Sequence, residues 1–154
     1  MMKDKGPNVK FPPPLMLIIC LGLGYTVHYF WPTKFIFQNV TMILGIINLI
    51  IALILILGCC FQFLKAKTHL EPWRESKTLI TWGMLRFSRN PIYLGFFFLG
   101  FSLSFFMNSL WVLLSLIPFY FLLHYFVIRK EEKYLNDKFK QQYQQYCKKV
   151  RRWL

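Results

Sequence analysis

Acidic residues are scarce in this sequence. Its 154 residues include 19 Lys and Arg against six Asp and Glu, so the formal net charge is +13. A basic excess of this size is typical of proteins that meet a nucleic acid or an anionic membrane surface. The distribution of the charges along the chain decides between these two classes.

The sequence also lacks paired cysteines at metal-ligand spacing, and it lacks internal repeats. Cys20, Cys59 and Cys60 fall inside apolar runs and Cys147 in the basic tail, so we expect free thiols and no zinc site. Without an internal duplication, the paired-repeat architecture of many transporters is disfavoured. No small-residue cleavage pattern follows the first apolar run, so we expect that run to stay as an anchor.

Apolar residues are abundant. The chain is 56% hydrophobic and 19% aromatic, which is too apolar for an ordinary soluble fold. Met42 to Phe61 carries no charge over 20 residues, and roughly 20 residues at ~1.5 Å each span the ~30 Å hydrocarbon core of a bilayer. We therefore predict an all-α membrane protein with a single membrane domain over residues 1–154 and about four transmembrane helices, at residues 15–31, 42–64, 91–107 and 110–128.

Two local features refine these spans. Only Asn108 and Ser109 separate the third span from the fourth, which predicts a tight helical hairpin. Pro118 should kink the fourth span, because it leaves the carbonyl four residues earlier without a donor.

The basic residues predict the orientation. Eighteen of the 19 lie before the first span, in the loop 65–90 or in the tail 129–154, and Lys34 alone lies on the other side. Because Lys and Arg near span ends are retained in the cytoplasm, we predict a multi-pass protein with both termini, the loop and an amphipathic tail helix on the cytoplasmic side. The net charge then requires no nucleic acid.

The Asn90–Pro91 pair marks the start of the third span, within RFSRNPIYLG from Arg86. Asn90 is pushed out of the helical region by the proline, and its side chain is suited to cap the helix. The N-terminus of a helix has unpaired backbone N–H groups and the positive end of the helix dipole, so it favours binding of an anion or an electron-rich ring edge. Arg86 and Arg89 lie nearby in the sequence. The same residues also fit a capped span whose two arginines reach the interface.

The tail carries one apolar stripe. Its members recur at separations of three, four or seven, typical of one helical face: Ile128, Leu135, Phe139, Tyr143, Tyr146 and Val150. At about 100° per residue, Glu132 falls inside this stripe, Glu131 on its margin and Arg129 on the opposite margin. A carboxylate on an inward face at a membrane boundary needs a partner or a ligand. The alternative is a local pair with a lysine on a solvated helix.

Together these motifs resemble the small integral membrane methyltransferases, which include isoprenylcysteine carboxyl methyltransferase and the phospholipid N-methyltransferases. The resemblance rests on TLITWGMLRFSRNPIYLG, an apolar hairpin, and then RKEEKYLNDKFKQQYQQYCKKVRR, and it covers about half the chain, from Thr68 to Arg152. It implies that cytoplasmic elements bind S-adenosylmethionine and release S-adenosylhomocysteine. It also implies that a lipid or lipidated acceptor reaches the methyl group from the bilayer.

Carried over by position, the resemblance implies a set of cofactor-binding residues. These are Lys77, Thr78, Leu79, Ile80, Gly83, Leu85, Asn90, Pro91, Ile92, Tyr93, Glu131 and Glu132. Leu85 stands where the family often has an aromatic residue, Asn90 replaces the histidine of the prenylcysteine enzymes, and Lys140 replaces a glycine common after the tail phenylalanine.

The chemistry of S-adenosylmethionine fits such residues. Protein carboxylates can bind the sulfonium and the ammonium of this ligand, and a basic side chain or the N-terminus of a helix can bind its carboxylate. We therefore predict that Arg129 and Glu132 are the catalytic residues, that Tyr93 offers an aromatic surface, and that no metal takes part. A carboxylate acceptor needs no base, whereas an amine must lose its proton. His124 is a candidate for that base, or else a structural histidine.

Two classes of acceptor fit the sequence: a phospholipid or other lipid amine, and a prenylcysteine-type carboxylate. Asn90 slightly favours the phospholipid or other lipid amine. A function of a different class is also possible for this sequence. The protein would then be non-catalytic, and its basic tail KKVRRW (Lys148 to Trp153) would bind anionic lipid head groups, at ~1 kcal/mol per basic residue. That alternative leaves Glu132 on the apolar stripe unexplained.

Overall fold

The computed structural model describes residues 6–34, 38–71, 73–76 and 78–154, and all regular structure in these residues is helical. The prediction of an all-α fold is confirmed for this part of the chain. In chain order the elements are α1 (Pro13–Phe30), α2 (Gln38–Lys65), the 3-10 turn η1 (Gly83–Arg86), α3 (Pro91–Phe106), α4 (Leu110–Leu114), α5 (Leu116–Leu123), the π turn η2 (His124–Ile128) and α6 (Arg129–Lys149).

Three helical stretches among the described residues are long and apolar enough to cross a membrane. They are α1, the part of α2 from Val40, and the run Leu110–Lys149, which contains α4, α5, η2 and α6. With 16 residues α3 is shorter. Large apolar side chains of α1 and α2, such as Ile18 and Leu57, are exposed, as expected for surfaces that face lipid. The count of four spans stays a prediction.

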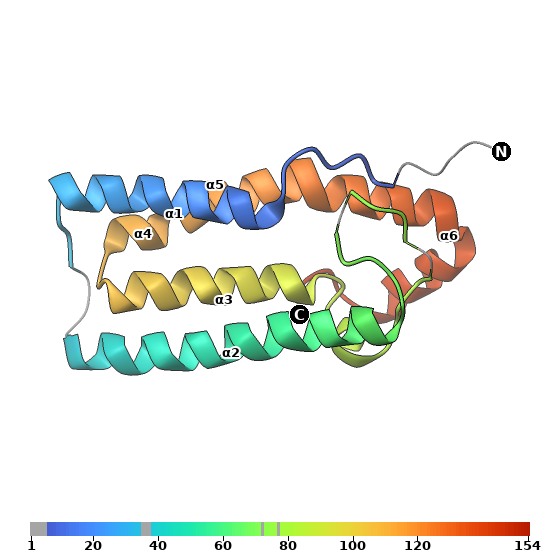
Figure 1. The fold of residues 1–154 in the computed structure, drawn as a ribbon, viewed down its shortest axis with the longest axis horizontal. Coiled ribbons are helices and arrows are strands. Elements are labelled where there is room, and N and C mark those ends of the chain that lie inside the picture. The colour runs from blue at the N-terminus through green and yellow to red at the C-terminus, as the bar shows by residue number, and fades with distance from the viewer. Residues whose placement is uncertain (1–5, 35–37, 72, 77) are drawn as a thin grey trace.

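The helices lie side by side along the long axis of the molecule (Figure 1). Contacts join α2 to α3, α3 to α4, and α1 to both α4 and α5. Small residues allow α2 and α3 to approach closely: a Cβ on Gly95 would lie only 2.7 Å from Ile56 Cγ1. Ser102 Oγ also donates to the carbonyl of Gly45 at 2.9 Å. These contacts are typical of helices packed inside a membrane.

The hairpin turn occurs where the sequence predicts it, and the helix is interrupted close to Pro118. Asn108 takes a positive φ of 43°, and Ser109 caps α4 by accepting from Val112 N at 3.3 Å. The fourth apolar run is interrupted between Leu114 and Leu116, next to the carbonyl that Pro118 leaves without a helical donor.

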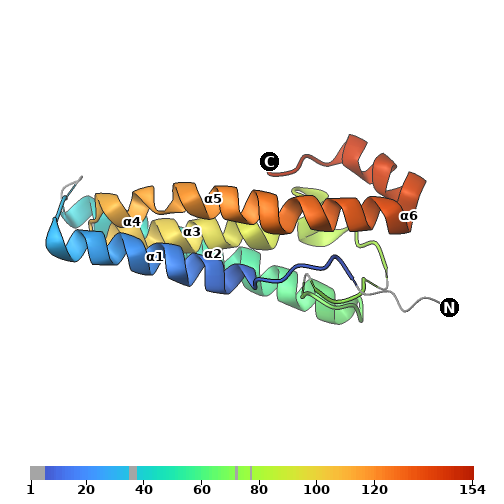
Figure 2. The same cartoon turned by 90° about the horizontal axis from the view of Figure 1, so that it is seen from above.

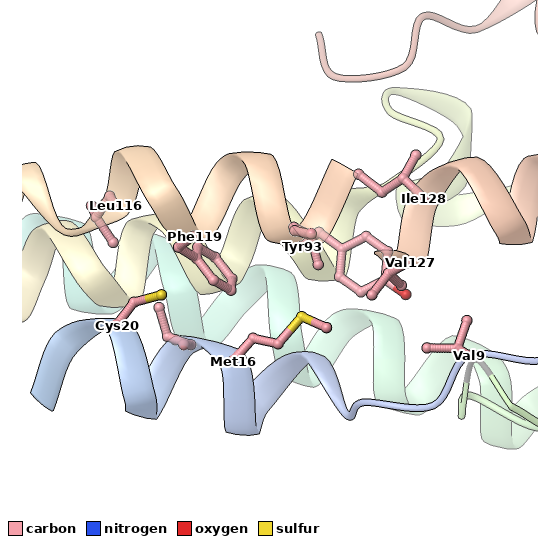
Figure 3. Packing of buried hydrophobic residues seen from close by; sticks show 10 residues of the cluster. Val9, Met16, Cys20, Tyr93, Leu116, Phe119, Val127 and Ile128 are labelled. Atoms are coloured by element: carbon pink, nitrogen blue, oxygen red, sulfur yellow. The ribbon is translucent and has the colours of Figure 1, made fainter. Parts of the chain in front are cut away.

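The main core lies between α1, α3 and the run from α5 into η2. Figure 3 shows Met16 and Cys20 of α1 facing Phe119 of α5 and Tyr93 of α3, with Val127 close to the Tyr93 ring. Tyr93 is therefore anchored in the core by its ring. Its hydroxyl group lies at the edge of the core, toward α6.

The tail helix does not run straight, and the prediction of one continuous helical stripe is wrong in this respect. Lys140 has φ 43° and ψ −116°, so α6 breaks there into two parts. Figure 2 shows the second part turning back over the bundle. α6, the loop after α2 and the N-terminal segment all lie at one end of the molecule (Figure 1).

Candidate cofactor cavity

The start of α3 forms one side of the site. The helix begins at Pro91, as predicted, and its first backbone hydrogen bond runs from Leu94 N to the Asn90 carbonyl at 3.0 Å. The predicted side-chain cap by Asn90 is wrong, because its Nδ2 instead donates to the carbonyl of Arg152 at 3.0 Å. Asn90 therefore joins two distant parts of the chain.

Residues 150–153, here called the tail segment, are tied to this helix start. Arg89 N donates to the Arg151 carbonyl at 3.0 Å, and Ser88 Oγ donates to the Arg152 carbonyl at 3.2 Å. The Trp153 ring packs 5.8 Å from the Phe97 ring and 6.0 Å from the Tyr120 ring. Polar and aromatic contacts together hold the tail segment in place.

The tail segment brings a guanidinium group to Glu132. Arg152 Nε and Nη2 donate to the two carboxylate oxygens at 3.0 and 2.8 Å, in bidentate geometry. Arg89 Nη2 lies 3.3 Å from Glu132 Oε1. The hydrogen bond to Glu132 raises the pKa of Arg152. Two cations thus balance the charge of Glu132 before any ligand is considered.

Glu131 has a different environment. It accepts a hydrogen bond from Tyr93 Oη at 2.8 Å, and it forms no ion pair with the part of the chain that the structure describes. Burial, and to a lesser degree the charge of Glu132, raises the pKa of Glu131 to about 7, against the opposing effect of the Tyr93 hydrogen bond. This carboxylate, which follows the end of the apolar run at Ile128, is the one available to an external cation.

The loop after α2 forms the third wall of the site and is fastened to α6. Ser76 N donates to Tyr134 Oη at 3.2 Å, and Lys138 Nζ pairs with Glu75 at 3.0 Å. Tyr146 Oη donates to the Leu85 carbonyl at 2.6 Å.

The start of α3, the first part of α6 and the loop after α2 surround a hollow with a cavity volume of about 120 Å³, here called the cofactor cavity. Ten of the sequence-predicted residues line it: Thr78, Leu79, Ile80, Leu85, Asn90, Pro91, Ile92, Tyr93, Glu131 and Glu132.

Three predicted residues have other positions. Lys77 lies outside the described residues. Gly83 has a positive φ of 61° and forms the turn into η1, where Gln62 Oε1 accepts from Met84 N at 2.9 Å. Arg129 does not line the cofactor cavity, and its guanidinium group lies 5.6 Å from the centre of the Tyr125 ring.

Sequence reasoning missed several residues of the cavity. His69, Glu71 and Arg74 line it from a loop with no motif of its own. Arg89, which the sequence predicts to lie near a bound anion, also lines the cavity, and its buried Nε has no hydrogen-bond partner among the described residues. Within the described residues, no three His, Cys, Asp or Glu side chains are grouped to hold a metal ion.

The family model described as phospholipid methyltransferase matches residues 40–142, which include α2, α3, the hairpin and the first part of α6. The tail segment lies beyond the matched range. No curated protein and no solved structure is similar enough to count as a match.

Proposed function

Because the chain belongs to the phospholipid methyltransferase family, we propose that it transfers a methyl group from S-adenosylmethionine to an acceptor that resides in the bilayer. The family membership makes it a methyltransferase, and its apolar helices make it an integral membrane protein. The observation that supports this donor best is the Tyr93–Glu131 contact, which places on the wall of the cofactor cavity a carboxylate that has no cationic partner among the described residues.

The residues present fit such a donor. When bound, S-adenosylmethionine supplies an electrophilic methyl group on a sulfonium. Glu131 would hold the positively charged part, and the unpartnered Nε of Arg89 would donate to the carboxylate. Leu79 and Ile80 would cover the nucleoside with apolar surface.

Glu132 then has a supporting role. Its bidentate pair with Arg152 and its contact with Arg89 fix both guanidinium groups beside the cavity. Tyr93, held by its ring in the core, orients the Glu131 carboxylate. A pre-oriented, partly buried site excludes water and aligns the reacting groups, which is where most of the acceleration of a methyl transfer should arise.

The alternative of a non-catalytic lipid-binding protein has less support. Lys148 and Lys149 are exposed and suited to anionic head groups. Arg152, however, is bound to Glu132, and its backbone carbonyl is occupied by Ser88 and Asn90. The tail segment is therefore tied to the start of α3 and to Glu132, whereas the alternative requires it to be available to the membrane.

Binding of S-adenosylhomocysteine to the detergent-solubilised full chain tests the proposal. We expect measurable binding by wild type and a loss of about tenfold or more in Glu131→Gln and in Tyr93→Phe, because each change removes a charge-assisted contact. Asp137→Asn is the matched control, since it removes an exposed carboxylate of α6 outside the cavity and should bind normally. Absence of wild-type binding would favour the lipid-binding alternative. Transfer of a labelled methyl group to lipid extracts would then identify the acceptor.

A further inference from the structure

The segment before α1 forms a fourth wall of the cofactor cavity. Residues 6–12, here called the strap, run from the start of α1 to the loop after α2 (Figure 1). Pro7 is buried and lines the cavity, whereas its neighbour Asn8 is exposed. The strap lies outside residues 40–142, the part of the chain that matches the family model. Membership of the family therefore does not account for this wall.

The strap is held on both sides of the residue that lines the cavity. On one side Gly6 packs against the backbone of the loop after α2, because a Cβ on it would lie 2.7 Å from the Trp73 carbonyl oxygen. On the other side Val9 is buried in the main core, and Figure 3 shows it at the end of the cluster where Val127 lies. The strap thus crosses the cavity between the loop and the core.

The backbone at Gly6 makes this crossing depend on glycine. Its φ is 68°, in the left-handed region that costs an ordinary residue about 1 kcal/mol or more. An added Cβ would also lie 2.8 Å from the carbonyl carbon of Arg74, and backbone atoms cannot turn aside as the end of a side chain can. A side chain at this position should therefore lift the strap from the loop.

The size of the cavity requires one of its walls to move. Its volume of about 120 Å³ is below the roughly 300–1,000 Å³ of most small-molecule sites. A nucleoside joined to an amino acid enters such a space only if a wall gives way. The start of α3 is a poor candidate, because the Tyr93 ring is buried in the main core.

Of the remaining walls, the strap has the weaker tie to α6. Lys130 Nζ donates to the Asn8 carbonyl at 3.4 Å, and this contact is exposed to water. The loop after α2 is held to α6 by a shorter ion pair, between Lys138 Nζ and Glu75 at 3.0 Å. Long, solvated hydrogen bonds contribute little to stability, and segments held by such contacts open first.

We propose that the strap is the lid of the cofactor cavity. It moves away to admit the methyl donor and to release the product, and in its closed position Pro7 covers the bound ligand. The identity of that ligand rests on the proposed function, whereas the opening of the strap does not. A closed strap keeps water from the reacting groups, and its opening sets the rate of ligand exchange.

Labelling of Cys59 tests the opening without any ligand. Cys59 lines the cofactor cavity and is buried, so a maleimide reaches it only when a wall opens. The protein is the full chain in detergent, with Cys59 as its sole cysteine, and the reagent is N-ethylmaleimide. We expect labelling about tenfold faster in Gly6→Ala, which strains the backbone, and in Val9→Ala, which removes buried apolar surface.

Gly22→Ala is the matched control for these variants. It makes the same chemical change as Gly6→Ala on an exposed face of α1, where an added Cβ meets nothing within 4 Å. Its labelling rate should stay within about twofold of wild type, and circular dichroism should show that every variant is helical. Labelling at the wild-type rate in either strap variant, or equal acceleration in Gly22→Ala, would overturn the inference.

Release of S-adenosylhomocysteine tests the strap as a lid over this ligand. We expect the ligand to protect Cys59 from labelling in wild type, and to dissociate at least about fivefold faster from Gly6→Ala than from Gly22→Ala. Equal dissociation rates would overturn the role of the strap in ligand exchange. Failure of wild type to bind S-adenosylhomocysteine would overturn the proposed function, while faster labelling of the strap variants would still support an opening strap.

Discussion

Glu131 and Glu132 are neighbours in the sequence, but their carboxylates have different partners. Glu132 contacts Arg89 and Arg152, whereas Glu131 accepts a hydrogen bond from Tyr93. Sequence periodicity predicts that Glu132 lies inside the apolar stripe and faces inward, and that Glu131 lies on the margin of the stripe. It does not predict which carboxylate keeps its charge available, because Arg152 reaches Glu132 only after the chain has turned back at Lys140.

The raised pKa of Glu131 predicts how ligand binding depends on pH. Its pKa of about 7 results from burial first, with a contribution from the Glu132 charge. The ammonium group of S-adenosylhomocysteine prefers ionised Glu131, so the affinity for this ligand should rise from about pH 6 to about pH 8, with release of a proton on binding. Glu131→Gln should show a much flatter profile. A profile of unchanged slope in this variant would show that another group titrates.

The sign is opposite for the stability of the ligand-free protein. The pKa of Glu131 is raised from 4.5 when unfolded to about 7 when folded, so the folded state binds the proton more tightly. The contribution of this group to stability is therefore fully present below pH 4.5 and is lost as the pH rises through about 7. Thermal unfolding without and with S-adenosylhomocysteine, over the same pH range, would reveal both trends.

At the scale of elements, local rules predict most boundaries. The apolar runs, the proline at the start of α3, the two-residue hairpin turn at Asn108–Ser109 and the break near Pro118 all follow from neighbouring residues. The reversal within α6 does not. The apolar stripe continues across Lys140 with helical spacing and without a proline or glycine, so periodicity predicts one straight helix. The docking of the tail segment depends on that reversal, so it cannot be predicted from the local sequence either.

Lys140 therefore offers a test of the reversal. Its φ of 43° and ψ of −116° lie in a region that suits glycine, and a side chain there costs about 1–3 kcal/mol. Lys140→Gly should relieve part of this strain and stabilise the protein by about 1 kcal/mol, after the larger entropy loss of glycine on folding. The measurement is thermal unfolding in detergent.

Lys140→Ala is the control for that variant, because it removes the same charge without relieving the backbone. We expect Lys140→Ala to show no gain in the melting temperature. If α6 were instead a continuous helix in solution, the order would reverse: alanine would stabilise the helix and glycine would destabilise it by about 1 kcal/mol. The two variants together thus distinguish a turned-back tail from a straight one.

At the scale of the whole molecule, polar and apolar parts are separated along the long axis. The N-terminal segment, the loop after α2 and α6 gather at one end (Figure 1). Residues of all three segments line the cofactor cavity, which therefore lies at this end. Large apolar side chains are exposed along α1 and α2. A donor from the aqueous phase and an acceptor from the bilayer can both reach that polar end, because it lies where the apolar helices stop.

The basic residues of the polar end predict that this end faces the cytoplasm and that Lys34, after α1, faces the other side. Single cysteines in a background without Cys20, Cys59, Cys60 and Cys147 would test it, with a membrane-impermeant maleimide applied to intact cells. Lys34→Cys should react from outside, whereas Arg86→Cys and Lys148→Cys should react only after permeabilisation. If Arg86→Cys and Lys148→Cys reacted from opposite sides, the loop and α6 could not share a cavity, and the proposed site would be wrong as a whole. If all three positions were reversed together, the site would survive and only its compartment would change.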